Sequence, residues 1–118
     1  MSYIQGLLIP VPLKNKDAYC TMAELAAPIF KDYGAIRIVE AWGDDVPDGK
    51  VTDFKRAVKA EADETVVFSW IEWPDKQTYE TAAKKMETDP RWAEMPDMPF
   101  DGKRMMWAGF APILDTKS

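Results

Sequence analysis

The stretch Gly43–Thr52, GDDVPDGKVT, combines glycines, a lysine and three aspartates in a spacing that suggests a phosphate or calcium site. A phosphate-binding loop reads G-x-x-x-x-G-K-[ST]. Here five residues separate Gly43 from Gly49, and Lys50 is followed by a valine. The aspartates would also repel the phosphates that such a loop must hold. The pattern therefore does not predict a phosphate site.

Calcium binding of the EF-hand type also fails on spacing. In a loop that starts at Asp44, valine occupies the second ligand position, and Lys55 stands where a bidentate glutamate must close the loop. The same residues suit a turn, because aspartate side chains such as that of Asp45 bond nearby amides, Pro47 fixes φ and Gly49 accepts a positive φ. A well-specified turn is the favoured interpretation. Adventitious binding of a divalent cation stays open, and no metal motif is predicted.

Two features of the composition restrict the chemistry further. The chain has no histidine and one cysteine, Cys20. This excludes histidine-containing zinc sites, nucleophilic catalysis with a serine–histidine or cysteine–histidine pair, and an imidazole base. The formal charge of −5 at pH 7 opposes nucleic-acid binding, which depends on cations that neutralise phosphates. Acid–base chemistry must therefore use Asp, Glu, Lys or Tyr, and no nucleic-acid partner is predicted.

An enzyme that acts on a small apolar or aromatic molecule, without a metal or redox cofactor, is compatible with this composition. Glu40 is the candidate general base, provided that burial raises its pKa toward neutrality. Ser69, a polar residue in an apolar stretch, is a candidate donor to a substrate oxygen. The other candidate ligand-binding residues are three arginines that could hold a carboxylate or phenolate and four aromatic residues that could wall a pocket: Arg37, Arg56, Arg104, Trp42, Phe68, Trp70 and Trp107.

Each of these residues also has a structural interpretation, which is the stronger one. Trp70 and Trp107 suit a core or a subunit interface. Ser69 suits a bond to a neighbouring carbonyl, or a position where only a small side chain fits. Glu40 and Arg104 suit an ion pair between strands or between subunits. Residue types alone therefore do not decide between an enzyme and a binding protein.

The apolar pattern predicts the elements that must position these side chains. Strands are expected at 2–11, 35–42, 64–73 and 103–114, with helices after the first and third. This order, strand, helix, strand, strand, helix, strand, predicts an α+β class, with a ferredoxin-like βαββαβ fold and a four-stranded antiparallel sheet. We expect one domain over residues 1–118.

Prolines and caps set the expected boundaries of these elements. Two prolines near the end of the first strand should end it or confine it to a sheet edge. The first helix follows Asn15, should kink or end early at Pro28, and has Gly34 at its C-terminal turn. The second helix opens at Asp75 and stops by Pro90. Residues between this stop and the last strand should form a loop with a single helical turn.

Apolar residues on both faces of two strands predict a second subunit. In the third strand Val66, Phe68 and Trp70 alternate with Val67 and Ile71. The last strand is similar. Two helices cover only one face of such a sheet, and a sheet that is solvated on its other face should alternate apolar with polar residues. A homodimer is the expected cover, the alternative being a loop of the same chain.

Three sequence blocks carry a resemblance to a known family. GDDVPDGK, ETVVFSWI and MPFDGKRM, with the opening IQGLLIPVP, resemble the DUF1428 family of small bacterial proteins, over nearly the whole chain. The resemblance implies a ferredoxin-like subunit that pairs sheet to sheet in a dimeric α+β barrel. It implies no activity, because the family is one of unknown function. The wider dimeric-barrel group includes cofactor-free monooxygenases, but fold analogy does not transfer function.

Two hypotheses therefore remain for the function. The first is a small-molecule site, with or without the cofactor-free chemistry described above. The second is a non-enzymatic, stress-associated or protein-binding module that uses GDDVPDGK and DMPFDGKR as one recognition surface. A closed aromatic pocket would favour the first. We expect a cytoplasmic protein with no membrane partner, because no apolar run approaches the ~20 residues of a membrane span and no signal-peptide pattern is visible.

Overall fold

A four-stranded antiparallel sheet in the order β2-β3-β1-β4 forms the centre of the molecule. The structure is a computed structural model and describes residues 2–117. Its elements are β1 (Tyr3–Pro12), the 3-10 turn η1 (Leu13–Asn15), α1 (Lys16–Asp32), β2 (Arg37–Trp42), α2 (Phe54–Ala57), β3 (Glu64–Trp73), α3 (Lys76–Met86), η2 (Pro90–Glu94) and β4 (Met106–Phe110). This arrangement confirms the predicted ferredoxin-like fold.

The two prolines of β1 lie where that strand has a neighbour on one side only. β1 pairs with β3 over its whole length, from Tyr3 to Pro12. β4 covers only the part from Ile4 to Leu8. Pro10 and Pro12 therefore lie beyond the reach of β4, where a missing N–H group leaves no partner unsatisfied. The predicted edge position is confirmed for this end of an otherwise central strand.

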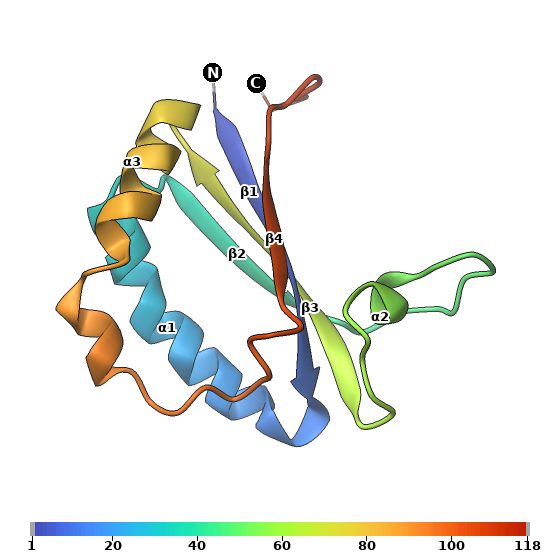
Figure 1. Cartoon of the computed structure of the whole chain (residues 1–118). Helices are drawn as coiled ribbons and strands as arrows, with labels where there is room; N and C mark the ends of the chain where they lie inside the picture. Colours follow the sequence, from blue (N-terminus) through green and yellow to red (C-terminus); the bar gives the residue numbers. More distant parts are fainter. Residues whose placement is uncertain (1, 118) are drawn as a thin grey trace.

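Both long helices cover the same face of the sheet (Figure 1). The β3 side chains on this face are buried, and Val11 of β1 and Trp73 of β3 are fully enclosed. α1 packs Tyr19 and Phe30 against them, and α3 contributes Ala82. Alternate residues of each strand lie on this face and most of them are apolar, which explains why two amphipathic helices pack on it.

α1 continues through Pro28, so the prediction of an early end is wrong. The helix runs to Asp32. Proline removes one backbone hydrogen bond, here to the carbonyl of Glu24, and both residues are exposed to solvent. Water can replace the lost donor at such a position. The helix then closes at Gly34, whose φ of 112° is as expected for this turn.

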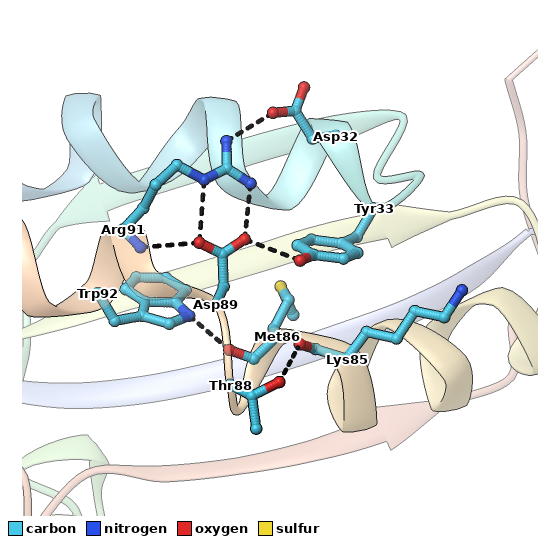
Figure 2. Close-up of polar contacts among 8 residues, drawn as sticks. All are labelled: Asp32, Tyr33, Lys85, Met86, Thr88, Asp89, Arg91 and Trp92. Atoms are coloured by element: carbon cyan, nitrogen blue, oxygen red, sulfur yellow. Dashed lines mark hydrogen bonds and ion pairs between the residues drawn. The ribbon is translucent and has the colours of Figure 1, made fainter.

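A cluster of polar side chains fastens the segment after α3 to the end of α1 (Figure 2). Arg91 donates to both carboxylate oxygens of Asp89, at 3.1 and 2.8 Å, and to Asp32 at 2.6 Å. The Tyr33 hydroxyl donates to Asp89 at 2.7 Å. The indole of Trp92 donates to a carbonyl of α3 at 2.8 Å. These contacts explain why a segment with only one helical turn keeps a defined position.

The opposite face of the sheet carries exposed apolar side chains. The strand register places Leu8 between Phe68 and Met106. Phe68 is 48% exposed, Met106 47% and Phe110 56%. β4 is shorter than predicted, because the chain leaves the sheet after Phe110 and Ile113 has no neighbours to cover it. The segment between β2 and β3, which carries α2, extends away from the helices (Figure 1).

Within residues 2–117, the helices are too short or too polar to cross a lipid bilayer.

Candidate functional site

A cavity of about 460 Å³ lies between α1 and the edge strand β2. Its walls are apolar for the most part, and its polar groups come from a few side chains. The lining residues from α1 are Lys16, Tyr19, Cys20, Ala23, Glu24, Ala27 and Lys31, and those from the sheet and the turn before it are Ile36, Arg37, Ile38, Glu40, Trp42 and Val67.

Simple periodicities bring these side chains together. On α1 the lining positions recur every three or four residues, from Lys16 to Lys31, and so form one stripe along the helix. On β2 the side chains of Ile38, Glu40 and Trp42 point to the helix side, because alternate residues of a strand share a face. β2 pairs only with β3, so its other edge opens toward the cavity.

Glu40 and Tyr19 form the polar centre of this cavity. The Tyr19 hydroxyl donates a hydrogen bond of 2.8 Å to Oε1 of Glu40. Tyr19 is 3% exposed, while Glu40 stays open to solvent through the cavity mouth. Ser69 lies directly opposite Glu40 in the β2–β3 pairing and is 1% exposed. A carboxylate thus faces an apolar cavity with two hydroxyl groups beside it.

The surroundings of Glu40 raise its pKa above the ordinary glutamate value. The largest cause is desolvation by the atoms of α1 and β3 around it, while the hydrogen bonds from Tyr19 and Ser69 act in the opposite direction. Burial and the nearby carboxylate also raise the pKa of Tyr19. Tyr19 is therefore a hydrogen-bond donor at neutral pH, and Glu40 is the group of this pair that can exchange a proton.

Trp42 and Lys16 form one end of the cavity. The Lys16 ammonium lies 5.7 Å from the ring centroid of Trp42, in cation–π geometry. Lys31 lies at the other end of the helical stripe, about 22 Å away along the helix axis, at 1.5 Å per residue. The two cations therefore stand at opposite ends of the same cavity.

The three arginines predicted to bind a ligand do not converge on Glu40. Arg37 touches the cavity, but its guanidinium lies 5.1 Å from the ring centroid of Trp70. Arg104 makes two hydrogen bonds, of 2.6 and 2.8 Å, to Glu64 and one to Asp101. Within the subunit, Arg104 therefore pairs with the carboxylate at the start of β3 and not with Glu40, while an ion pair between subunits stays a prediction.

Arg56 stabilises the acidic loop. It donates to the carbonyl of Gly49 at 2.8 Å and lies 3.3 Å from Asp53. Asp53 accepts from the amides of Gly49 and Arg56 and caps α2. These bonds agree with the interpretation of a specified turn. No group of three or more His, Cys, Asp or Glu side chains in the described part of the chain is arranged to hold a metal ion.

The predicted aromatic wall is divided between several places. Trp42 lines the cavity. Phe68 and Trp70 share the opposite face of the sheet, and Trp107 is 56% exposed on β4. The loops 43–52 and 97–104 are not joined by any hydrogen bond among residues 2–117. The second loop instead bonds to Asn15, Lys59 and Glu64, on other parts of the chain.

Sequence reasoning missed Tyr19 and Lys16 as site residues. Tyr19 fits the apolar stripe of α1, and its hydroxyl group was therefore not considered. The available clue was the helix–strand register: in this fold α1 packs on the sheet, so an inward-facing tyrosine and a carboxylate on a helix-facing strand position can meet. Lys16 carries no such pattern, because a lysine in the first turn of a helix is common.

Comparison with known proteins adds a family and a fold. The profile of a family described as "Protein of unknown function (DUF1428)" matches residues 2–102. A protein of Escherichia coli (strain K12) named "Uncharacterized protein YbaA" is 58% identical over 116 residues, which cover 98% of this chain and 99% of that protein.

Two solved structures share the fold at low identity. A dimeric ferredoxin-like protein from an uncultured marine organism is 9% identical with a TM-score of 0.60, covering 98% of this chain and 100% of the other. SnoaB, a cofactor-independent oxygenase from Streptomyces nogalater, is 11% identical with a TM-score of 0.60, covering 99% of this chain and 98% of the other. At such identities the likeness establishes the fold alone.

Proposed function

This chain belongs to the DUF1428 family, whose function is unknown, and we propose that it binds a small apolar or aromatic molecule in the cavity between α1 and β2. The observation that carries the proposal is the Glu40 carboxylate, with a raised pKa, on the wall of a cavity of about 460 Å³. Cavities of this size that are apolar with a few convergent polar groups are typical small-molecule sites.

Glu40 gives the site a chemical capability beyond binding. A base whose pKa is shifted toward neutrality can accept a proton from an acidic O–H or C–H group of a bound molecule. The Tyr19 hydroxyl holds the carboxylate in position through its 2.8 Å hydrogen bond. Proton transfer to Glu40 would leave the negative charge on the ligand. The cofactor-independent oxygenase with the same fold supports this proposal by analogy only.

We propose further that two copies pair through the open sheet face. Phe68, Met106 and Phe110 are each about half exposed there. An apolar face of this kind usually marks an interface, and one of the structures with this fold is described as dimeric. The cavity lies on the opposite, helix-covered side of the sheet, so each subunit keeps its own site in such a homodimer.

The alternative of a protein-binding module has less support from this geometry. It requires the loops 43–52 and 97–104 to form one surface, and their hydrogen bonds lead to different parts of the chain. The α1–β2 cavity, with the Glu40 carboxylate on its wall, supports the small-molecule hypothesis, although this cavity is open at its mouth and Trp42 is the one predicted aromatic residue among those that line it.

Binding of 2-naphthol tests both parts of the proposal. This aromatic alcohol becomes a much stronger acid on excitation, so its fluorescence shows whether a base accepts its proton. We expect saturable binding to the wild type with naphtholate emission, and neutral naphthol emission with unchanged affinity within a few-fold in Glu40→Gln. Glu24→Gln is the matched control, since Glu24 is another carboxylate of the cavity wall.

The outcomes separate binding from chemistry. Naphtholate emission that persists in Glu40→Gln, or is lost equally in Glu24→Gln, would exclude Glu40 as the proton acceptor. If the probe binds but the NMR signals of Trp42 and Tyr19 do not change, the binding site lies elsewhere. Native mass spectrometry of gently purified protein would in the same preparation report the subunit number and any retained small molecule.

A further inference from the structure

We propose that the ligand of the α1–β2 cavity is a small aromatic monoanion whose carboxylate is bound by Lys16 beside Trp42. This proposal rests on the proposed function and adds the chemical class of the ligand. Its basis is the placement of the cations around the cavity and the partners that each of them already has.

The arginines of the chain that were candidates for this role are already engaged. The guanidinium of Arg37 stacks on Trp70, on the far side of the sheet. Arg56 is bonded to its own loop, and Arg104 to Glu64 and Asp101. Arg56 and Arg104 would have to give up these contacts to bind a ligand anion. Arg37 lines the cavity, but its guanidinium lies over Trp70 and not over Trp42 at the cavity wall.

Lys16, by contrast, has no carboxylate partner among the described residues. It lines the cavity, and none of the ion pairs among residues 2–117 involves it. Its ammonium is held over the face of Trp42 at 5.7 Å from the centroid. Lys16 and Tyr19 are three residues apart on α1, so their Cβ atoms lie about 5–6 Å apart on the same side of the helix, and both residues line the cavity with Glu40.

This arrangement matches a ligand with an anionic end and an aromatic body. The carboxylate would bind the ammonium at the Trp42 end, and a ring would lie along Ala23, Ile38 and Val67, which line the same cavity. A dicarboxylate is disfavoured, because its second charge would meet Glu40 or Glu24. A neutral ligand would leave the Lys16 ammonium unpaired. A ligand cation at the Trp42 end of the cavity would be repelled by this ammonium.

Lys31 provides the internal control. It lines the cavity and, like Lys16, is in none of the ion pairs of the described chain. It lies about 22 Å farther along the helix, at 1.5 Å per residue, beyond the reach of a one- or two-ring ligand seated at Trp42. A long-range effect of positive charge would therefore depend on both lysines, whereas direct binding depends on Lys16 alone.

The test compares 2-naphthoate with 2-naphthamide, which have similar shapes but differ in charge. Calorimetric titrations use the wild type, Lys16→Met and Lys31→Met at two salt concentrations. We expect the wild type to prefer the carboxylate, and Lys16→Met to lose at least about tenfold in affinity for it, as for a charge-assisted bond. Binding of the amide should not change, and Lys31→Met should bind both probes as the wild type does.

Each other outcome is decisive. Equal losses in the two lysine variants would show a general field effect and overturn the proposal. Equal binding of carboxylate and amide by the wild type and Lys16→Met would overturn the anion preference and leave the small-molecule site in place. If neither probe nor 2-naphthol binds the wild type, the cavity is not a site for aromatic ligands, and both proposals fail.

Discussion

Tyr19 on α1 and Glu40 on β2 are joined by a hydrogen bond of 2.8 Å that connects the first helix to the edge strand. The tyrosine is buried and the carboxylate faces the cavity. One contact therefore serves two purposes: it fastens the helix to the edge of the sheet, and it orients an acid–base group toward an open space. Changes at either residue should affect both the stability of the fold and the ionisation of Glu40.

Tyr19→Phe should raise the pKa of Glu40 further and lower the stability. The hydroxyl group favours the ionised carboxylate, so its removal leaves desolvation less opposed. The lost hydrogen bond should cost about 1 kcal/mol in the free energy of unfolding. NMR titration of the Glu40 carboxyl carbon and urea unfolding measure the two effects. Tyr33→Phe, whose hydroxyl bonds to Asp89 instead, is the control. A Glu40 pKa that is unchanged in Tyr19→Phe would contradict this account of the pair.

Glu40→Gln should change how stability depends on pH. A carboxyl group whose folded-state pKa lies above its ordinary value of 4.5 binds its proton more tightly in the folded state. Its favourable contribution is present below pH 4.5 and is lost as the pH rises through the folded-state pKa. The wild type should therefore lose stability relative to Glu40→Gln as the pH rises above 4.5. Urea unfolding at several pH values checks this, and a constant difference between the two proteins would show that the pKa is not raised.

The sequence predicts those parts of the fold that depend on neighbours along the chain. β3 has the predicted bounds, Glu64–Trp73, because β-branched and aromatic residues fill it without interruption. α3 begins as expected, since the Asp75 side chain accepts from the amide of Thr78 three residues later. Local chemistry is sufficient for such elements, and no distant contact overrides it.

The cavity depends on contacts that no local pattern records. Tyr19 and Glu40 are 21 positions apart, and Arg104 reaches Glu64 across 40 positions. Sequence reasoning identified Glu40, Arg37 and Trp42, which do line the cavity, but it also included Phe68, which lies on the opposite face of the sheet. Residue types identified candidate side chains, but which of these side chains lie together depends on how α1 packs on β2.

Arg104→Met should destabilise the fold more than Arg56→Met does. Arg104 is the partner of Glu64, a carboxylate that is 7% exposed, and it also donates to the carbonyl of Lys59, whose φ is 51°. Loss of one partner leaves a buried charge unpaired, which is among the larger penalties for a single substitution. Arg56 bonds to an exposed loop, where ion pairs contribute little. Thermal unfolding of the two variants gives the comparison.

The double variant Glu64→Gln with Arg104→Met isolates the cause. With the carboxylate removed, much of the stability lost in Arg104→Met should return, because no uncompensated charge remains. A double variant less stable than the single one would mean that Arg104 acts through packing or through Lys59 and not through the charge of Glu64.

Phe68→Asp should dissociate the proposed homodimer. Phe68 is 48% exposed at the middle of the open sheet face, next to Leu8. A carboxylate placed in the centre of an apolar interface should raise the dimer dissociation constant at least about thirtyfold, as for a central interface residue. Leu25→Asp is the matched control, since Leu25 is 49% exposed but lies on α1, away from that face. Sedimentation velocity over a range of concentrations measures the equilibrium. A dimer that survives Phe68→Asp but not Leu25→Asp would place the interface on the helices, and a monomeric wild type would leave the open face without its proposed cover.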